Sequence, residues 1–393
     1  MSLKRQLLVS FGVQGAGAAA VLLSTLLLGA RLGPEVQGGF SRLKAEVEFV
    51  AAFAMLGLPQ ALFFHVKSGG LSLPAALRWA FGCALLALPI GALYAAMRHA
   101  QDDAGEIVLL GVAVAMMVVH GQLRALLLVR ERTAWFNAMT ALPQWLVLVG
   151  VLYVLAHGGA AAPGWLALFA LAFGIAASIS WWRLRDATDD GIAQTQVGWR
   201  ELGHYGAAAW LTAALSTAAV LLVQRWVEGA QGGAALGRFT VAMTLVQVPL
   251  TPISYAAPLL LRRWMEQPGA RASRRAAVAV FVLIATVALV VGASAQAWPD
   301  LGLGAAYAGA TGALAVLLAG GAAEAASRVL TVQASAQGLP WVAVRAEVVR
   351  WSVLLIGWTM ISIPSLLAVS VLWAAAAWAA ALVFAWQARS ASS

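Results

Sequence analysis

The chain has 393 residues, of which 62% are apolar and only 10% are charged, and its formal net charge at neutral pH is +9. Soluble domains contain roughly 25% charged residues, so this composition excludes a soluble globular protein and indicates an integral membrane protein. In a membrane protein, an excess of Lys and Arg is explained by cytoplasmic loops. We therefore expect no nucleic-acid partner.

Long apolar runs predict twelve membrane-spanning helices, because about 20 apolar residues cross a bilayer as a helix. The runs are continuous and do not alternate in ten-residue pieces, which argues against a transmembrane β-barrel. The expected spans are residues 7–30, 41–64, 74–97, 107–129, 134–156, 163–182, 205–227, 237–261, 276–297, 304–327, 341–362 and 364–386.

The longest connection between spans falls midway along the chain, at about residues 183–204. It separates six helices from six, so we predict an all-α polytopic fold with two lobes, residues 1–190 and residues 191–393. A Phe and a Pro are nineteen residues apart in both halves, Phe40 and Pro59 in the first and Phe239 and Pro258 in the second. This spacing favours an internal repeat.

The Lys and Arg residues outside the spans are distributed unevenly. With the N-terminus in the cytoplasm, fifteen fall on the cytoplasmic side and three, Arg31, Arg98 and Arg238, on the other. By the positive-inside rule this bias predicts that both termini are cytoplasmic.

Eleven ionisable residues lie inside the predicted spans, where a charge at the centre of a helix costs about 2.5–3.5 kcal/mol. Four pairs are spaced to share one helix face: Arg42–Glu46, Lys44–Glu48, Glu324–Arg328 and Glu347–Arg350. We expect these pairs either to line a cavity or to join helices. The cations near span ends could instead reach the lipid headgroups.

Three further arginines, Arg124, Arg225 and Arg345, are left without an acid at helical pairing distance in their own span, because Glu347 in the span of Arg345 is assigned to Arg350. Glu228 is a candidate partner for Arg225 at the membrane edge. His120 shares a helix face with Arg124 and is expected to join helices by a hydrogen bond rather than to bind a ligand. Neither metal-ligand spacing of His and Cys nor a Walker-type nucleotide loop is present, so no metal, cofactor or ATP hydrolysis is expected.

Two stretches resemble a known family. The segment from Leu26 to Pro59 resembles the opening of bacterial polysaccharide-transport proteins, the O-antigen (Wzx-type) flippases of the multidrug/oligosaccharidyl-lipid/polysaccharide (MOP) exporter superfamily. The matching positions are Ala30-Arg31-Leu32-Gly33-Pro34, Gly38, Phe40, Leu56-Gly57-Leu58-Pro59 and, in the second half, Leu236-Gly237-Arg238-Phe239-Thr240-Val241-Ala242.

The resemblance implies a MATE-like architecture, with two six-helix lobes around a central cavity that opens alternately to either side of the bacterial inner membrane. The substrate would be an oligosaccharide on undecaprenyl pyrophosphate, such as a repeat unit of O-antigen, capsule or exopolysaccharide, moved from the cytoplasmic to the periplasmic leaflet. The implied partners are membrane lipid, this polyprenyl-pyrophosphate-linked glycan and other polysaccharide-assembly proteins. The driving force, whether membrane potential, H⁺ or Na⁺, stays open.

Arginines suit such a substrate because a guanidinium forms bidentate contacts with phosphate groups. The expected substrate-binding residues of a cationic cavity are Arg31, Arg124, Arg225, Arg345 and Arg350. Further cavity or ion-pair residues are Arg42, Lys44, Glu46, Glu48, His120, Glu324, Arg328 and Glu347.

Other classes of protein fit these features less well. A multidrug cation exporter of the same superfamily would need a net acidic cavity, whereas the surplus here is positive. A membrane glycan polymerase or acyltransferase would need a large outer loop with catalytic groups, so we do not expect an enzyme. A twelve-helix sugar or amino-acid permease would carry a basic Gly-rich signature at about residues 65–71, which is absent. A non-transporting scaffold of envelope assembly stays open.

Overall fold

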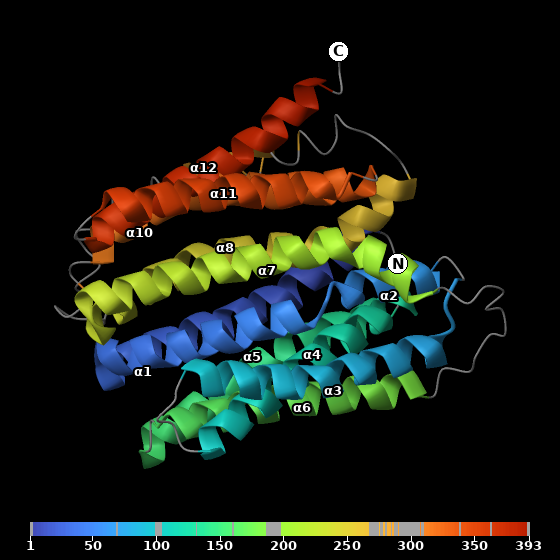
Figure 1. Cartoon of the computed structure of the whole chain (residues 1–393), viewed down its shortest axis with the longest axis horizontal. Coiled ribbons are helices and arrows are strands. Elements are labelled where there is room, and N and C mark those ends of the chain that lie inside the picture. Colours follow the sequence, from blue (N-terminus) through green and yellow to red (C-terminus); the bar gives the residue numbers. More distant parts are fainter. Residues whose placement is uncertain are drawn as a thin grey trace. The chain divides into compact units, whose positions relative to one another are not determined.

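The computed structural model of the chain is built of α-helices (Figure 1). It describes residues 3–67, 70–98, 104–130, 132–158, 161–185, 198–266, 310–337, 339–361 and 364–390, together with isolated positions between 275 and 307. The helices are α1 (Leu3–Ala54), α2 (Leu58–Lys67), α3 (Leu73–Arg98), α4 (Ala104–Val129), α5 (Thr133–His157), α6 (Ala162–Arg185), α7 (Trp199–Gln231), α8 (Gly233–Glu266), α10 (Ala310–Ala336), α11 (Trp341–Met360) and α12 (Leu366–Ser390).

These helices confirm the predicted all-α polytopic fold. Within the described residues, eight helices are long and apolar enough to cross a membrane. The predicted span 276–297 lies outside the described residues apart from isolated positions. α11 is absent from the eight because its sequence carries Arg345, Glu347 and Arg350.

The first two predicted spans are not separated by a loop. α1 continues through residues 31–40, which were expected to connect the spans, and it bends only at Gly33, where φ is +84°. Glycine adopts this conformation without a Cβ clash, and Pro34 has the fixed φ that suits the first turn of a helix. The Gly33-Pro34 pair therefore makes a kink and restarts the helix at once.

The second predicted span, residues 41–64, is interrupted and was wrongly predicted to be continuous. Met55, Leu56 and Gly57 form a turn between α1 and α2, in which Leu56 and Gly57 have φ values of +51° and +67°. At the end of α1, the Phe53 carbonyl accepts a hydrogen bond of 2.8 Å from the Trp210 indole N–H. This bond helps to satisfy one of the carbonyls that a helix end leaves without a partner.

Contacts between residues divide the chain into two compact units. We call residues 42–218 the central unit and residues 1–41 with 219–393 the composite unit. α1 and α7 each contribute residues to both units. The boundary between lobes predicted at residue 190 lies outside the described residues and stays a prediction.

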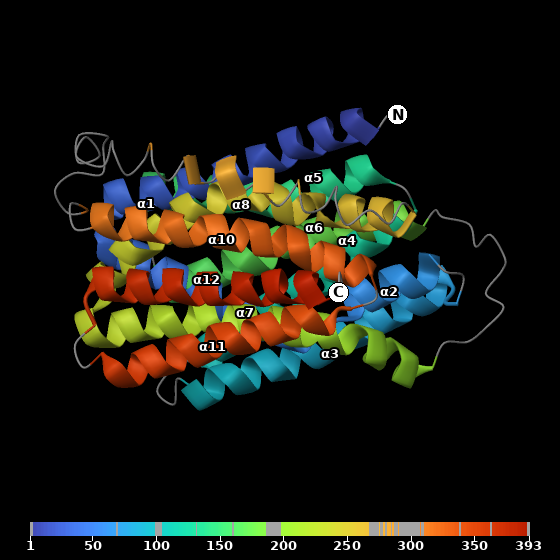
Figure 2. The same cartoon turned by 90° about the horizontal axis from the view of Figure 1, so that it is seen from above.

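In the central unit, α4 packs against α3 and α6, while α2 lies on α4 and α5 lies on α6 (Figures 1 and 2). The buried face of α4 is formed by Val114, Val118 and Leu126, with the fully buried Gln122 between the last two. α4 is thus the helix around which this unit is built.

In the composite unit, α10 packs against α8 and α12, and α11 packs against α12 (Figure 2). The core between these helices includes Phe239, Leu250, Leu317 and Trp373. Charged residues of α10 and α11 adjoin this core.

Glycines allow a close backbone approach between α1 and α8 within the composite unit. A Cβ atom on Gly237 would collide with the backbone carbonyl of Pro34, and one on Gly38 with that of Gly233. Small residues at such crossings are typical of helix pairs in membranes.

The Gly237 contact yields a stability prediction. We expect Gly237→Ala to lower stability by about 1–3 kcal/mol, the usual cost of overpacking, because backbone atoms cannot rotate away from the new methyl group. Thermal unfolding of the purified protein in detergent measures this loss. Gly39→Ala is the matched control, since a Cβ at Gly39 would meet no heavy atom within 4 Å; equal stability of the two variants would contradict the proposed contact.

Candidate functional site

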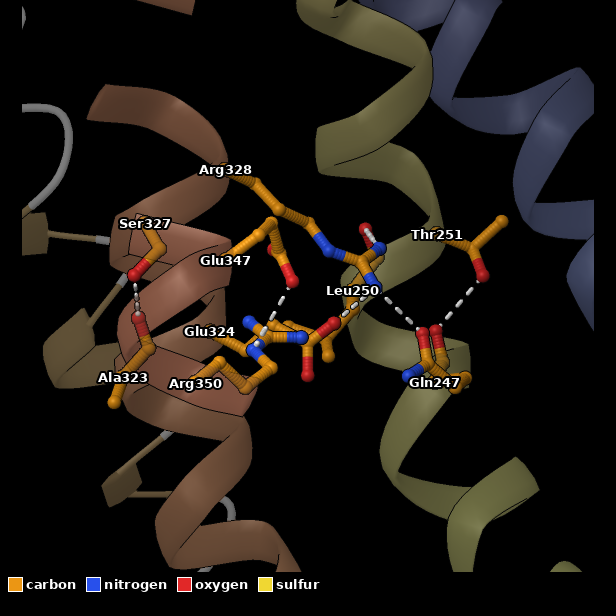
Figure 3. Close-up of polar contacts among 9 residues, drawn as sticks. All are labelled: Gln247, Leu250, Thr251, Ala323, Glu324, Ser327, Arg328, Glu347 and Arg350. Atoms are coloured by element: carbon orange, nitrogen blue, oxygen red, sulfur yellow. Dashed lines mark hydrogen bonds and ion pairs between the residues drawn. The ribbon is translucent and has the colours of Figure 1, made fainter. Parts of the chain in front are cut away.

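A buried network of charged and polar side chains joins α8, α10 and α11 (Figure 3). We call Gln247, Glu324, Arg328, Glu347 and Arg350 the buried network. Glu324 and Arg328 are one turn apart on α10, and Arg328 Nη2 lies 2.6 Å from Glu324 Oε1. Arg328 also reaches α8, because Nη2 donates to Gln247 Oε1 at 2.8 Å and Nη1 donates to the Leu250 carbonyl at 3.4 Å.

α11 contributes the other ion pair of the buried network. Arg350 Nε lies 3.6 Å from Glu347 Oε2, and the Arg350 guanidinium carbon is 5.7 Å from the centroid of the Trp373 ring on α12. Only 7% of Glu324, 8% of Glu347 and 4% of Arg350 is exposed. Charges this deeply buried in apolar helices must be paired to be tolerated.

The pairing on α11 leaves a hydrogen-bond donor free. Arg350 Nε and Glu347 Oε2 are both buried, lie 3.6 Å apart and make no hydrogen bond among the described residues. Buried donors are seldom left without an acceptor. Arg350 could therefore accommodate an additional anionic oxygen, which makes the buried network the strongest candidate site in the composite unit.

All the predicted local ion pairs are present. Besides the two pairs of the buried network, Arg42 Nε lies 3.7 Å from Glu46 Oε1, Lys44 Nζ lies 2.6 Å from Glu48 Oε1, and Arg225 Nη1 lies 3.7 Å from Glu228 Oε2. Each pair is three or four residues apart on one helix, where neighbouring side chains meet.

Glu46 has a second cationic partner that the sequence did not predict. Its carboxylate is fully buried and forms an ion pair with Arg98 at the end of α3 as well as with Arg42. Arg98 was expected to lie outside the spans as a loop charge. Two arginines therefore contact one buried carboxylate at this place in the central unit.

His120 joins α4 to α5, as the sequence predicted. Its Nε2 lies 2.9 Å from the Met139 carbonyl. Because an oxygen of this kind only accepts, Nε2 is the donor. The Met139 carbonyl is available because the residue four positions later is Pro143, which has no backbone N–H to complete the helical hydrogen bond.

This arrangement predicts an energetic coupling between His120 and Pro143. We expect His120→Leu to destabilise the protein by about 1–3 kcal/mol, the cost of a buried acceptor left without a partner. In a Pro143→Ala background the same change should cost less, because the introduced alanine would supply the missing backbone N–H. Thermal unfolding of the four proteins in detergent measures the coupling, and equal costs in both backgrounds would refute the role of Pro143.

Arg124 lies one turn after His120 on α4 and also reaches α5. Its Nη1 donates to Thr140 Oγ1 at 3.4 Å, and its guanidinium carbon lies 5.5 Å from the centroid of the Phe136 ring. The Thr140 hydroxyl donates to the Phe136 carbonyl at 2.7 Å, so its oxygen is free to accept from Arg124. The Thr140 hydroxyl thus connects this cation to α5.

The remaining predicted substrate-binding residues lie at separate positions. Arg31 is exposed, two residues before the Gly33 kink, and Arg225 is half-buried beside Glu228. Arg345 is exposed on α11, where it lines a shallow hollow with Trp341, Val344, Val348 and Val349. Arg124 belongs to the central unit, and the other four arginines belong to the composite unit.

The structure adds Gln247 and Trp373 to the residues found from the sequence. Both contact arginines of the buried network from other helices. Gln247 is a polar residue within an apolar helix and could have been singled out on that ground. Trp373 could not, because an aromatic residue in a membrane span is unremarkable by itself.

The fold is similar to those of known membrane transporters. An inward-facing multidrug resistance MATE family transporter of the MOP superfamily aligns with a TM-score of 0.71 at 14% identity, over 95% of this chain and 94% of its own. A MATE crystallised in complex with MaL6 aligns with a TM-score of 0.75 at 15% identity, over 99% and 96% of the two chains.

A lipid II flippase has the same fold. MurJ in an inward closed conformation aligns with a TM-score of 0.73 at 10% identity, over 97% of this chain and 87% of its own. No protein-family model and no curated protein matches the sequence. The chain therefore has the two-lobed helical fold of these transporters, as the resemblance of its two sequence stretches implied, and at these identities the similarity establishes the fold alone.

Proposed function

We propose that the protein is a flippase that moves a polyprenyl-pyrophosphate-linked oligosaccharide from the cytoplasmic to the periplasmic leaflet of a bacterial inner membrane by alternating access. The observation that carries this proposal is the buried Arg350 with its unpartnered Nε in a chain of this fold. A pyrophosphate head must pass about 30 Å of hydrocarbon. Guanidinium groups offset its desolvation by charge-assisted hydrogen bonds.

The proposed substrate contacts are Arg350 first, with Arg31, Arg124, Arg225 and Arg345 as further cations. Substrate would bind at Arg350 when a phosphate oxygen replaces the Glu347 carboxylate as the acceptor for Arg350 Nε. The Glu347 oxygen lies 3.6 Å from this nitrogen, beyond hydrogen-bond distance. The polyprenyl tail need not leave the lipid. Membrane potential, H⁺ or Na⁺ would supply the driving force, and other polysaccharide-assembly proteins would supply and consume the glycan.

Multidrug export is the second candidate function, favoured by the MATE structures among the similar folds. A site for organic cations needs surplus negative charge. The buried network contains two arginines and two glutamates, and Glu46 contacts two arginines, Arg42 and Arg98. Neither of these described groups provides a surplus of negative charge, which argues against a cationic substrate.

Two transport assays separate the candidates. The purified protein in liposomes should increase the access of an externally added, membrane-impermeant glycosidase to a polyprenyl-pyrophosphate oligosaccharide initially protected in the inner leaflet. Deletion in the source bacterium should leave lipid-linked glycan on the cytoplasmic face. Export of a cationic dye without any movement of the lipid-linked glycan would instead support the multidrug function.

The proposed direction of transport depends on membrane topology, which reporter fusions test. With both termini cytoplasmic and twelve spans, a fusion after Gly105 should report the periplasm, and one after Gly191 should report the cytoplasm. A periplasmic phosphatase and a cytoplasmic fluorescent protein distinguish the two sides. The same location for both fusions would overturn the topology.

A further inference from the structure

An arginine in contact with two tryptophan rings lies where α5 begins and α6 ends. The guanidinium carbon of Arg183 is 3.8 Å from the centroid of the Trp135 ring and 4.3 Å from that of Trp182. Arg132, just before α5, donates from Nη1 to the Arg183 backbone carbonyl. We call Arg132, Trp135, Trp182 and Arg183 the Arg183 cluster. All four residues belong to the central unit.

The Arg183 side chain is positioned but not neutralised within the described part of the chain. There it has no carboxylate within ion-pair distance, and its Nε is buried without a hydrogen-bond partner. The guanidinium carbon lies over both indole rings, and the guanidinium N–H groups are the part of this side chain that can bind an anion. Such stacking reduces the side-chain freedom that binding would otherwise remove.

The surroundings of the cluster have the character of a membrane interface. Trp181 and Trp182 are exposed at the end of α6, and Trp181 meets Phe81 of α3 edge-on, with ring centroids 5.1 Å apart. Exposed tryptophans at helix ends are typical of the headgroup level of a bilayer. Arg132 also brings a second guanidinium to Arg183, so two cationic side chains lie together at these helix ends.

We propose that the Arg183 cluster binds the headgroup of an anionic phospholipid from the surrounding bilayer. A phosphodiester oxygen accepts hydrogen bonds from the N–H edge of Arg183, while acyl chains lie along the exposed aromatic side chains of α3 and α6. Basic pockets between transmembrane helices are known to hold anionic lipid headgroups in this way. The site is separate from the substrate contacts proposed above, and it does not depend on the transported molecule.

Native mass spectrometry of the full-length protein in detergent tests the site, with phosphatidylglycerol as the anionic probe and phosphatidylcholine as the zwitterionic one. We expect tighter binding of phosphatidylglycerol. Arg183→Gln should weaken that binding by roughly tenfold, the effect of one charge-assisted hydrogen bond. Arg183→Lys, which keeps the charge but loses the stacked planar group, should weaken it by a smaller factor.

Arg78→Gln is the matched control, because Arg78 is an exposed cation on α3, three residues before Phe81. It should change phosphatidylglycerol binding less than twofold. An equal loss in Arg78→Gln and Arg183→Gln would show a diffuse electrostatic attraction and overturn a built site, as would unchanged binding in Arg183→Gln.

Two further measurements keep the proposal testable if Arg183→Gln does not fold and distinguish a bilayer phospholipid from the transported lipid. If Arg183→Gln does not fold, Trp135→Leu removes one wall of the cluster and should also weaken phosphatidylglycerol binding, so unchanged binding would refute the proposal. Polyprenyl pyrophosphate is added as a competitor to the wild-type protein. Displacement of phosphatidylglycerol at equimolar competitor would identify a loading site for the transported lipid and overturn the assignment to a bilayer phospholipid.

Discussion

Arg328→Met is expected to destabilise the protein by about 3 kcal/mol, the lower end of the range for breaking a buried ion pair by removing one partner. The variant leaves Glu324, which is only 7% exposed, without its 2.6 Å contact to a cation. Gln247 also loses its hydrogen-bond donor from α10. The lower end applies because the Arg328 side chain is 27% exposed. Thermal unfolding in detergent, with chemical denaturation as a check, measures the loss.

The double variant Arg328→Met, Glu324→Leu separates structure from function. Removing both charges of a buried pair is often neutral or stabilising, so the double variant should recover most of the stability that Arg328→Met loses. If the buried network serves transport, the double variant should be folded and yet translocate lipid-linked glycan poorly. Full transport by the stable double variant would show that this pair only joins helices.

Local interactions explain what the sequence predicted well. The helix bounds follow apolar runs, because a backbone in hydrocarbon must satisfy its own hydrogen bonds. The ion pairs within helices follow from the helical period, which brings Glu324 next to Arg328 and Glu347 near Arg350. The sequence predicted that His120 forms a hydrogen bond between helices. It did not identify the acceptor, the Met139 carbonyl, which has no helical partner because Pro143 lacks a backbone N–H.

Contacts between distant residues explain what the sequence did not predict. Arg98 was assigned to a loop because it ends an apolar run, and only the packing of α3 beside α1 shows that it pairs with Glu46. The turn at Met55–Gly57 lies within an apolar run that was predicted to be one helix, although Gly57 and Pro59 are residues that interrupt helices. The helix is broken where Gly57 meets the backbone of Gly206 on α7. Backbone approach of this kind has no local pattern in the sequence.

Arg124 gives the sharpest test of an anion-binding mechanism in the central unit. Its guanidinium contacts the Thr140 hydroxyl and the Phe136 ring. A guanidinium in a membrane helix keeps its positive charge and can attract a phosphate oxygen. We expect Arg124→Ala to reduce the initial rate of glycan translocation in liposomes by at least about tenfold, as expected for the loss of one charge-assisted hydrogen bond in the transition state.

Arg124→Lys should also impair translocation, though less, because an ammonium keeps the charge and lacks the planar fork of donors that matches phosphate. Thr140→Val is the matched control, because it removes the hydroxyl that Arg124 contacts and keeps the cation. Transport should then fall by no more than about twofold, because the lost hydrogen bond has a neutral acceptor. Stability must be measured for all three variants, because Arg124 also joins α4 to α5.

The wider series replaces Arg31, Arg225, Arg345 and Arg350 by Ala one at a time. If these four variants and Arg124→Ala are all produced at normal levels and translocate glycan at the full rate, transport does not use arginine to carry the pyrophosphate, and the acidic partners Glu324 and Glu347 become the groups to test against a cationic substrate.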